Sequence, residues 1–212
     1  MSKVIDIIHK SKSTFVLRTE KPIEKILPGQ CFSIGTPDTS INREYSIYSS
    51  PQEDYLDFLI REVEDGYISK KLKTLKKNDN VEINGPFGEF LVPLNYINKK
   101  FLFICTGTGI APFHSFVKSF EKLDYKILHG IRYSDEKYDS KVYDENRYIP
   151  CISKNDEGES LHVTDYLKNN EKFLNHFDYI YLCGNRMMIS ETLDILDFAK
   201  ISGDKIITEV FF

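Results

Sequence analysis

The architecture of this chain is most clearly indicated by Phe101-Leu-Phe-Ile-Cys105-Thr106-Gly107-Thr108-Gly109-Ile-Ala-Pro112. The apolar run predicts a buried strand, and the small residues after it predict a tight turn that opens a helix. Glycines at such a strand end let a nucleotide approach the backbone closely, as in open α/β sheets. Pro112 stands where the G-x-G-x-x-G dinucleotide motif has its last glycine, so the stretch taken alone fits an ordinary turn better.

The residues after Asn98 alternate between strands and helices. Strands are predicted at 101–105, 126–131, 148–152, 179–183 and 205–211, and helices at 111–122, 164–173 and 186–200. This alternation favours a parallel sheet covered by helices. Polar and turn-forming residues at 93–100 mark a boundary, which gives an α/β domain over residues 98–212.

Residues 1–97 follow a different pattern of short β-rich runs separated by turn residues. Six strands are predicted, at 4–8, 14–18, 30–34, 44–48, 55–62 and 81–84. Six closely spaced strands are typical of a small antiparallel β-barrel. Ile68, Leu72 and Leu75 fall at helical spacing, so one helix is expected between Gly66 and Asn78. The predicted fold is a β-barrel domain followed by an α/β parallel-sheet domain.

Composition narrows the class of protein. The 212 residues are 41% hydrophobic and 28% charged, which is typical of a globular protein. A net charge of -4 argues against nucleic-acid binding. The four cysteines lack metal-ligand spacing, so no metal is expected. No signal peptide or membrane-spanning apolar run is found, so we expect a cytoplasmic protein without a membrane partner. We also expect the protein to be a monomer.

Two motifs in the first half suit a flat, phosphorylated ligand. Arg43-Glu44-Tyr45-Ser46 combines a cation, an aromatic ring and a hydroxyl at a strand end. These groups can hold a phosphate, stack on a flat ring and form a hydrogen bond with it. Gly66-Tyr67-Ile68-Ser69 opens the predicted helix, whose N-terminus attracts anions. The alternative is that Ser69 only caps this helix.

Two further motifs lie in the second half. Cys183-Gly184-Asn185 repeats the strand-end arrangement, so that two strand ends can frame one crevice. A cysteine at such a place is more often a small buried hydrophobic residue than a reactive group. The terminal Glu209-Val210-Phe211-Phe212 follows a predicted strand and is aromatic, so we expect it to be tethered to the folded body.

Taken in order, these motifs resemble those of the ferredoxin-NADP reductase family, and the resemblance spans almost the whole chain. The compact length and the aromatic ending are most similar to the bacterial ferredoxin/flavodoxin-NADP reductases. Each motif is short, so the resemblance rests on their order, which is Arg43-x-Tyr45-Ser46, Gly66-x-x-Ser69, Gly85-Pro86-Phe87-Gly88, Gly107-Thr108-Gly109-Ile110-Ala111-Pro112, Cys183-Gly184-Asn185 and Glu209-x-Phe211-Phe212.

The resemblance implies that FAD and NADP are the cofactors. It implies FAD contacts from Arg43, Tyr45, Ser46, Gly66, Ser69, Phe211 and Phe212. It implies NADP contacts from Thr106, Gly107, Thr108, Gly109, Pro112, Cys183 and Gly184, with Arg132, Ser153 and Lys154 near the 2′-phosphate. The implied catalytic residues are Ser46, Cys183, Glu209 and Phe211, the last stacking over the flavin where the family usually has tyrosine.

The activity implied by the resemblance is electron transfer between NADP(H) and a one-electron carrier, ferredoxin or flavodoxin, through FAD. Lys70, Lys71 and Lys73 are candidates for a basic rim that attracts an acidic carrier. Two alternatives stay open. One is an NAD(P)H-dependent reductase of free flavin or another acceptor from the same superfamily, and the other is a nucleotide-binding module without catalysis.

Overall fold

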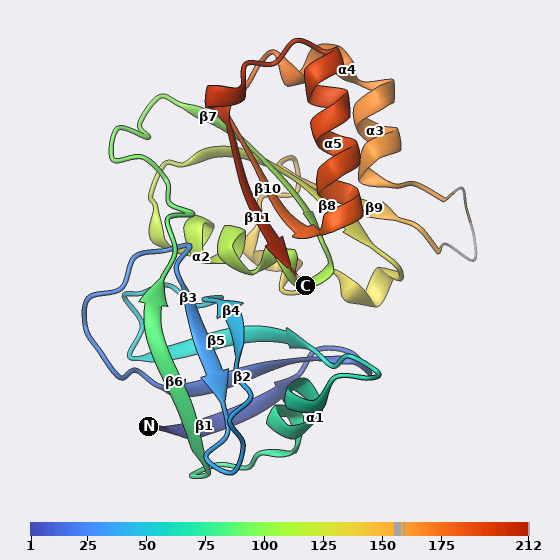
Figure 1. The fold of residues 1–212 in the computed structure, drawn as a ribbon. Helices are drawn as coiled ribbons and strands as arrows, with labels where there is room; N and C mark the ends of the chain where they lie inside the picture. The colour runs from blue at the N-terminus through green and yellow to red at the C-terminus, as the bar shows by residue number, and fades with distance from the viewer. Residues whose placement is uncertain (155–157, 159, 212) are drawn as a thin grey trace. The chain divides into compact units, whose positions relative to one another are not determined.

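The computed structural model describes residues 1–154, 158 and 160–211, which form two compact units (Figure 1). The first unit comprises Met1–Val92 and Ala111–Ser119. The second comprises Pro93–Ile110 and the residues from Phe120 onward. The helix at 111–119 thus groups with the first unit, although it follows the boundary expected after residue 97. Each unit is described below by itself.

The first unit is built on six antiparallel strands. They are β1 (Ser2–His9), β2 (Thr14–Glu20), β3 (Cys31–Gly35), β4 (Arg43–Ser46), β5 (Tyr55–Arg61) and β6 (Asn80–Phe87). Their order in the sheet is β4-β3-β6-β1-β2-β5. Ile47, directly after β4, bridges to Phe58 of β5, and the Tyr48 N–H donates to the Asp57 carbonyl at 2.7 Å. These contacts join the two outer strands, so the predicted β-barrel is confirmed.

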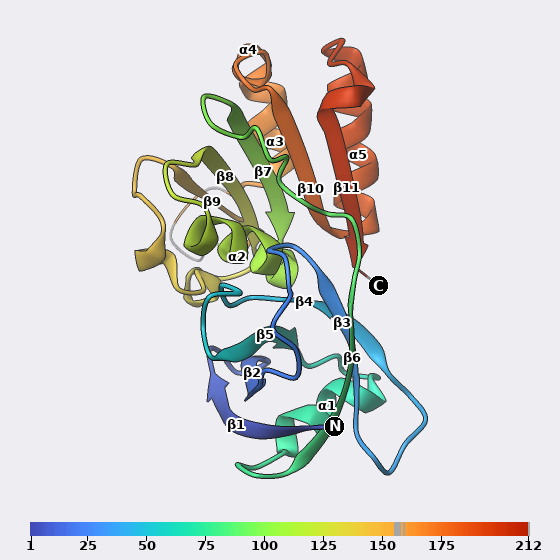
Figure 2. The ribbon, with the colours of Figure 1, turned by 90° about the vertical axis from the view of Figure 1, so that its left-hand side faces the viewer.

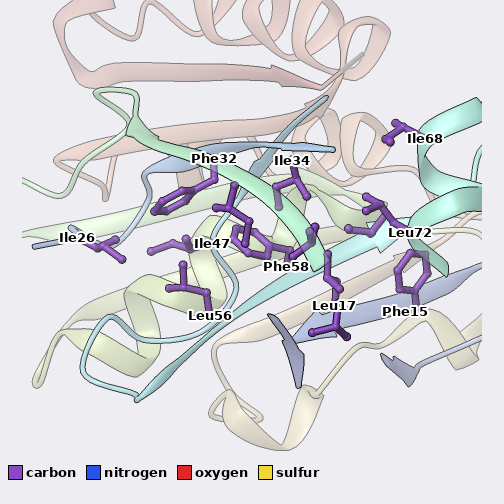
Figure 3. Close-up of a cluster of buried hydrophobic side chains, with 14 residues drawn as sticks. Phe15, Leu17, Ile26, Phe32, Ile34, Ile47, Leu56, Phe58, Ile68 and Leu72 are labelled. Atoms are coloured by element: carbon purple, nitrogen blue, oxygen red, sulfur yellow. The ribbon is translucent and has the colours of Figure 1, made fainter. Parts of the chain in front are cut away.

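The barrel is filled by apolar side chains from its strands and from helix α1 (Tyr67–Thr74), several of which Figure 3 shows. Ile68 and Leu72 lie one helical turn apart on α1, and both are buried in this core. Phe32 and Phe58 meet edge to face, with ring centroids 5.8 Å apart. Burying one such side chain contributes about 1.5–3 kcal/mol, so this cluster is the main support of the barrel.

The second unit contains five parallel strands. They are β7 (Lys100–Thr106), β8 (Asp124–Ile131), β9 (Tyr148–Ile152), β10 (Tyr179–Asn185) and β11 (Ile206–Phe211). Their order is β11-β10-β7-β8-β9, and Figure 2 shows β7, β10 and β11 running side by side in one direction. The predicted α/β parallel sheet is therefore confirmed. No helix in the described residues is long and apolar enough to cross a membrane.

Three helices cover one face of the parallel sheet, namely α3 (Val163–Asn169), α4 (Glu171–Leu174) and α5 (Arg186–Phe198). The single helix expected at 164–173 is interrupted at Asn170, which ends α3 and precedes α4. Helix α2 (Ala111–Ser119), which groups with the first unit, ends earlier than expected, and Lys122 follows it with a positive φ of 59°. Short 3-10 turns complete the unit at Gly107–Ile110, Ser134–Glu136, Ser140–Val142 and Gly203–Lys205.

Strand register aligns polar residues across the sheet. Cys183 of β10 pairs with Glu209 of β11 and with Cys105 of β7, and Cys105 pairs with His129 of β8. Side chains paired in this way on neighbouring parallel strands point to the same face. The register therefore forms one transverse row, Glu209-Cys183-Cys105-His129, next to the strand ends.

Candidate functional site

Strand β4 carries the predicted cation, ring and hydroxyl in the first unit. Arg43 is exposed and donates to the Asn42 carbonyl at 2.9 Å. Tyr45 is half-buried against the barrel core, and burial raises its pKa to about 12, so the phenol stays neutral. Ser46 is buried. The residues present fit a group that combines a pyrophosphate with a flat ring, as FAD does.

The turn before α1 is held by Ser69. The Val63 N–H donates to the Ser69 hydroxyl oxygen at 3.1 Å, and the Gly66 N–H donates to the Val63 carbonyl at 2.9 Å. A Cβ at Gly66 would lie 2.8 Å from the Val63 Cβ, so the turn requires glycine there. Ser69 therefore has a structural role in this turn, and its contact with a phosphate of FAD stays a proposal.

Two of the three lysines expected in a basic rim form ion pairs. Lys71 pairs with Asp38, and Lys73 pairs with Glu62. The paired carboxylates offset the lysine charges. The net positive charge around α1 is therefore smaller than the lysine count of the sequence implies.

The ends of β7 and β10 interlock in the second unit. The Thr106 hydroxyl oxygen accepts hydrogen bonds from the backbone N–H and the side-chain Nδ2 of Asn185, each at 3.1 Å. A Cβ at Gly184 would lie 2.3 Å from Thr106 Oγ1, and one at Gly109 would lie 2.4 Å from the Cys183 carbonyl oxygen. Both glycines are therefore required by the close approach of the two strand ends. The nucleotide crevice predicted at these strand ends stays a prediction.

Gly107 has a different environment from the other two glycines. Its φ is +54°, in the left-handed region, and a Cβ added there would meet nothing within 4 Å. Thr108 follows it in the 3-10 turn, and Pro112 lies near the start of α2, where a missing N–H breaks no helical hydrogen bond. The open side of Gly107 fits the approach of a nucleotide phosphate to the backbone.

Sequence reasoning missed His129 and the contacts of Asn185. His129 is fully buried, and its Nε2 lies 2.8 Å from the Gly107 carbonyl oxygen. Asn185 caps α5 by accepting the Met188 N–H at 2.8 Å. Two features of the sequence could have pointed to these residues: a single histidine within an apolar predicted strand, and an asparagine at the start of a predicted helix.

Cys183 and Glu209 lie beside each other at paired positions of β10 and β11. The Cys183 sulfur lies 3.8 Å from the Glu209 carboxylate oxygen. Burial raises the pKa of Cys183 well above its usual value, and the nearby Glu209 carboxylate raises it further. The thiol is therefore protonated. Phe211 pairs in register with Asn185 at the end of β11, and Phe212 lies outside the described residues.

The residues expected near the 2′-phosphate lie together at the ends of β8 and β9. The Ser153 N–H donates to the Ile131 carbonyl and the Lys154 N–H to the Arg132 carbonyl, each at 2.9 Å. The buried Glu136 carboxylate accepts the Arg132 N–H at 2.7 Å. Arg132 and Lys154 are therefore neighbours along the backbone, both side chains are exposed, and the Lys154 ammonium lies 5.8 Å from the centroid of the Tyr133 ring. Exposed cations at one end of the sheet fit binding of a phosphate group.

Known proteins share this arrangement of domains. Residues 3–91 match the oxidoreductase FAD-binding domain, and residues 103–194 match the oxidoreductase NAD-binding domain. The ferredoxin-NADP reductase of Pseudomonas aeruginosa is 27% identical over 99% of this chain and 96% of its own length. The structure of ferredoxin-NADP+ reductase from Plasmodium falciparum superposes with a TM-score of 0.83 at 27% identity, covering 99% of this chain and 95% of that one.

The chain belongs to the ferredoxin-NADP reductase family. Among other members of the family, the apicoplast ferredoxin-NADP reductase of Plasmodium falciparum is 32% identical over 62% of this chain, a stretch that spans 44% of that longer protein. As a ferredoxin-NADP reductase family member, the chain is an FAD-dependent oxidoreductase that uses NADP. The family, the enzyme class and both cofactors predicted from the sequence are thereby confirmed.

Proposed function

We propose that the enzyme passes electrons between NADP(H) and a ferredoxin or flavodoxin, and that it acts as a monomer in the cytoplasm. The observation that carries the proposal is the Gly107 turn, which is open to a ligand and linked to the next strand end through Thr106 and Asn185. The same chain presents Arg43, Tyr45 and Ser46 on one strand. Four free cysteines suit the reducing cytoplasm.

In this proposal the barrel holds FAD through β4 and the turn before α1. The Arg43 guanidinium pairs with the pyrophosphate, and the neutral Tyr45 ring packs against the flavin. The Ser46 hydroxyl forms a hydrogen bond near the reactive ring nitrogen, while Gly66 and Ser69 complete the phosphate site. FAD supplies the link between one-electron and hydride chemistry, because it takes up electrons singly or in pairs.

The second unit holds NADP at the ends of its parallel strands. Backbone N–H groups of the turn at Gly107, Thr108 and Gly109 bind the pyrophosphate. Arg132 and Lys154 bind the 2′-phosphate as cations, with Ser153 as a hydrogen-bonding neighbour. This charge favours NADP over NAD, because NAD lacks the 2′-phosphate.

In this proposal the nicotinamide site is formed by Cys183, Gly184, Glu209 and Phe211. The protonated Cys183 thiol is small and largely apolar, so it sets the contact without acting as a nucleophile. Its S–H orients the Glu209 carboxylate. Glu209 and the Ser46 hydroxyl would each serve as a proton carrier in the reaction. Phe211 would contribute an aromatic face to the flavin site.

A comparison of electron acceptors tests the proposed function. The purified enzyme with FAD is given NADPH and, in separate reactions, ferredoxin, flavodoxin or free flavin. The proposal predicts the highest kcat/KM with one of the two carrier proteins. A preference for free flavin would instead identify a flavin reductase of the same superfamily.

A further inference from the structure

His129 lies directly beneath the turn that opens the nucleotide site. It is placed there by the sheet register, since β8 is the neighbour of β7 and His129 pairs with Cys105, two residues before Gly107. The imidazole is fully buried, and its Nε2 lies 2.8 Å from the Gly107 carbonyl oxygen. His129 is therefore the side chain that holds this carbonyl from within the domain.

The hydrogen bonds fix the form of the imidazole. The Gly107 carbonyl only accepts, so Nε2 carries the hydrogen. Nδ1 lies 2.8 Å from the Tyr148 hydroxyl, which donates to it when the ring is neutral. Burial lowers the pKa of His129 to about 4 and raises the pKa of Tyr148, so both groups keep these forms near neutral pH. The imidazole is thus a fixed donor to the turn.

A fixed carbonyl also fixes the next N–H. The peptide bond is planar and trans, so its C=O and N–H point in opposite directions. Because the Gly107 carbonyl points toward His129, the N–H of Thr108 points away from it. Gly107 itself has open space where a Cβ would lie, so a ligand can approach the turn.

We propose that His129 is a positioning residue for nucleotide binding, which turns the Gly107–Thr108 peptide so that the Thr108 N–H is presented to the pyrophosphate of NADP(H). The inference rests on the proposed function. It assigns His129 a role through the turn and no contact with the nucleotide.

Ile127 offers a matched control for this role. It lies two residues before His129 on β8, so its side chain points to the same face, and it is also fully buried. Ile127→Ala should lower Tm because it leaves a cavity in the sheet. It removes no hydrogen bond to the Gly107 turn, so it separates general destabilisation from loss of positioning.

The test uses the full-length enzyme with FAD bound. The dissociation constant for NADP+ is measured by calorimetry, alongside kcat, KM for NADPH and FAD content. His129→Leu should raise Kd and KM by about 10- to 100-fold, the range expected for a buried carbonyl that loses its donor. FAD content and kcat at saturating NADPH should stay at wild-type values. His129→Gln, whose amide can donate to the same carbonyl, should restore most of the affinity.

Tyr148→Phe is the second variant, since it removes the donor to Nδ1 while keeping the ring. It should weaken NADP+ binding less than His129→Leu does, and it keeps the test decisive if the leucine variant does not fold. Wild-type Kd values in every folded variant of His129 and Tyr148 would overturn the role of His129. A wild-type enzyme that binds FAD but not NADP+ would instead overturn the proposed function, and the positioning role with it.

Discussion

Cys183 and Glu209 occupy paired positions on neighbouring parallel strands, with the thiol sulfur 3.8 Å from the carboxylate oxygen. The thiol is buried and protonated, so its S–H points a weak hydrogen bond at the carboxylate. The pair therefore fixes where a carboxylate stands at the edge of the sheet. This position is the structural basis for the proposal that Glu209 takes part in proton transfer.

Glu209→Ala should slow flavin reduction by NADPH. Loss of a hydrogen bond to a charged group should lower the rate of flavin reduction by about 10- to 100-fold. FAD should stay bound, because its other contacts with the protein are intact. Stopped-flow absorbance under anaerobic conditions measures the rate, and Thr208→Ala, an exposed neighbour on β11, is the control. If the Glu209 variant reacts at the wild-type rate with NADPH and with the carrier protein, Glu209 has no part in the reaction.

Gly107→Ala and Gly109→Ala should differ in what they impair: Gly109→Ala should mainly lower the stability of the fold, and Gly107→Ala should mainly weaken NADP+ binding. Gly109→Ala places a Cβ 2.4 Å from the Cys183 carbonyl oxygen, so it should destabilise the fold by about 1–3 kcal/mol and lower Tm by several degrees. Gly107→Ala meets no atom and adds only about 1 kcal/mol of backbone strain, but its methyl group occupies the side open to the nucleotide. Its main effect should be weaker NADP+ binding.

Thermal unfolding and calorimetric titration with NADP+ distinguish these two glycines. The interpretation of Gly107 as the ligand-facing position is wrong if its alanine variant binds NADP+ normally.

Arg132→Gln and Lys154→Gln should each raise KM for NADPH by about 10-fold or more, since charge-assisted hydrogen bonds to the 2′-phosphate are lost. KM for NADH should hardly change, because NADH has no phosphate there. Lys141→Gln removes an exposed charge of the same domain and serves as the control. Equal increases for both coenzymes would show that the two cations do not select NADP.

The buried His129 predicts a specific dependence of stability on pH. Its pKa falls from 6.5 to about 4 in the folded state, mainly through burial. Between these values the unfolded chain takes up a proton that the folded chain does not, so stability present above pH 6.5 is lost as the pH falls toward 4. From about pH 7.5 to about pH 5 this loss is about 2 kcal/mol.

Urea unfolding at both pH values measures this dependence. His129→Gln has no titrating group at this position, so its free energy of unfolding should fall by about 2 kcal/mol less than that of the wild type. All other groups are the same in both proteins, so their contributions cancel in the comparison. Parallel decreases would contradict the buried, neutral state of His129.

Local sequence patterns located most of the secondary structure, because they reflect the period of strands and helices. The strand at 148–152 was predicted with the bounds that the structure has. Strand β6 was instead expected to end at residue 84, because glycine and proline follow and usually end a strand. It runs on through Gly85 and Pro86 because β3 still pairs with it at Phe87.

Features that depend on contacts between distant segments were not predictable in this way. Lysines were visible around α1, but the pairing of Lys71 with Asp38 depends on how a remote loop folds. The meeting of His129 with Gly107 requires the register of two strands joined by a helix, which no local pattern specifies. The order of the short motifs along the sequence pointed to the candidate site. The contacts that support this site, such as that of His129 with Gly107, became visible only in the structure.

We infer that this chain catalyses hydride exchange between NADP(H) and FAD. Anaerobic titration of the purified, FAD-loaded protein with NADPH, followed by the visible flavin absorption, measures this reaction. We predict a yellow protein that bleaches on addition of NADPH and regains its colour when oxidised ferredoxin or flavodoxin is added. A protein that takes up no FAD, or whose flavin absorption is unchanged by NADPH, would contradict the claim.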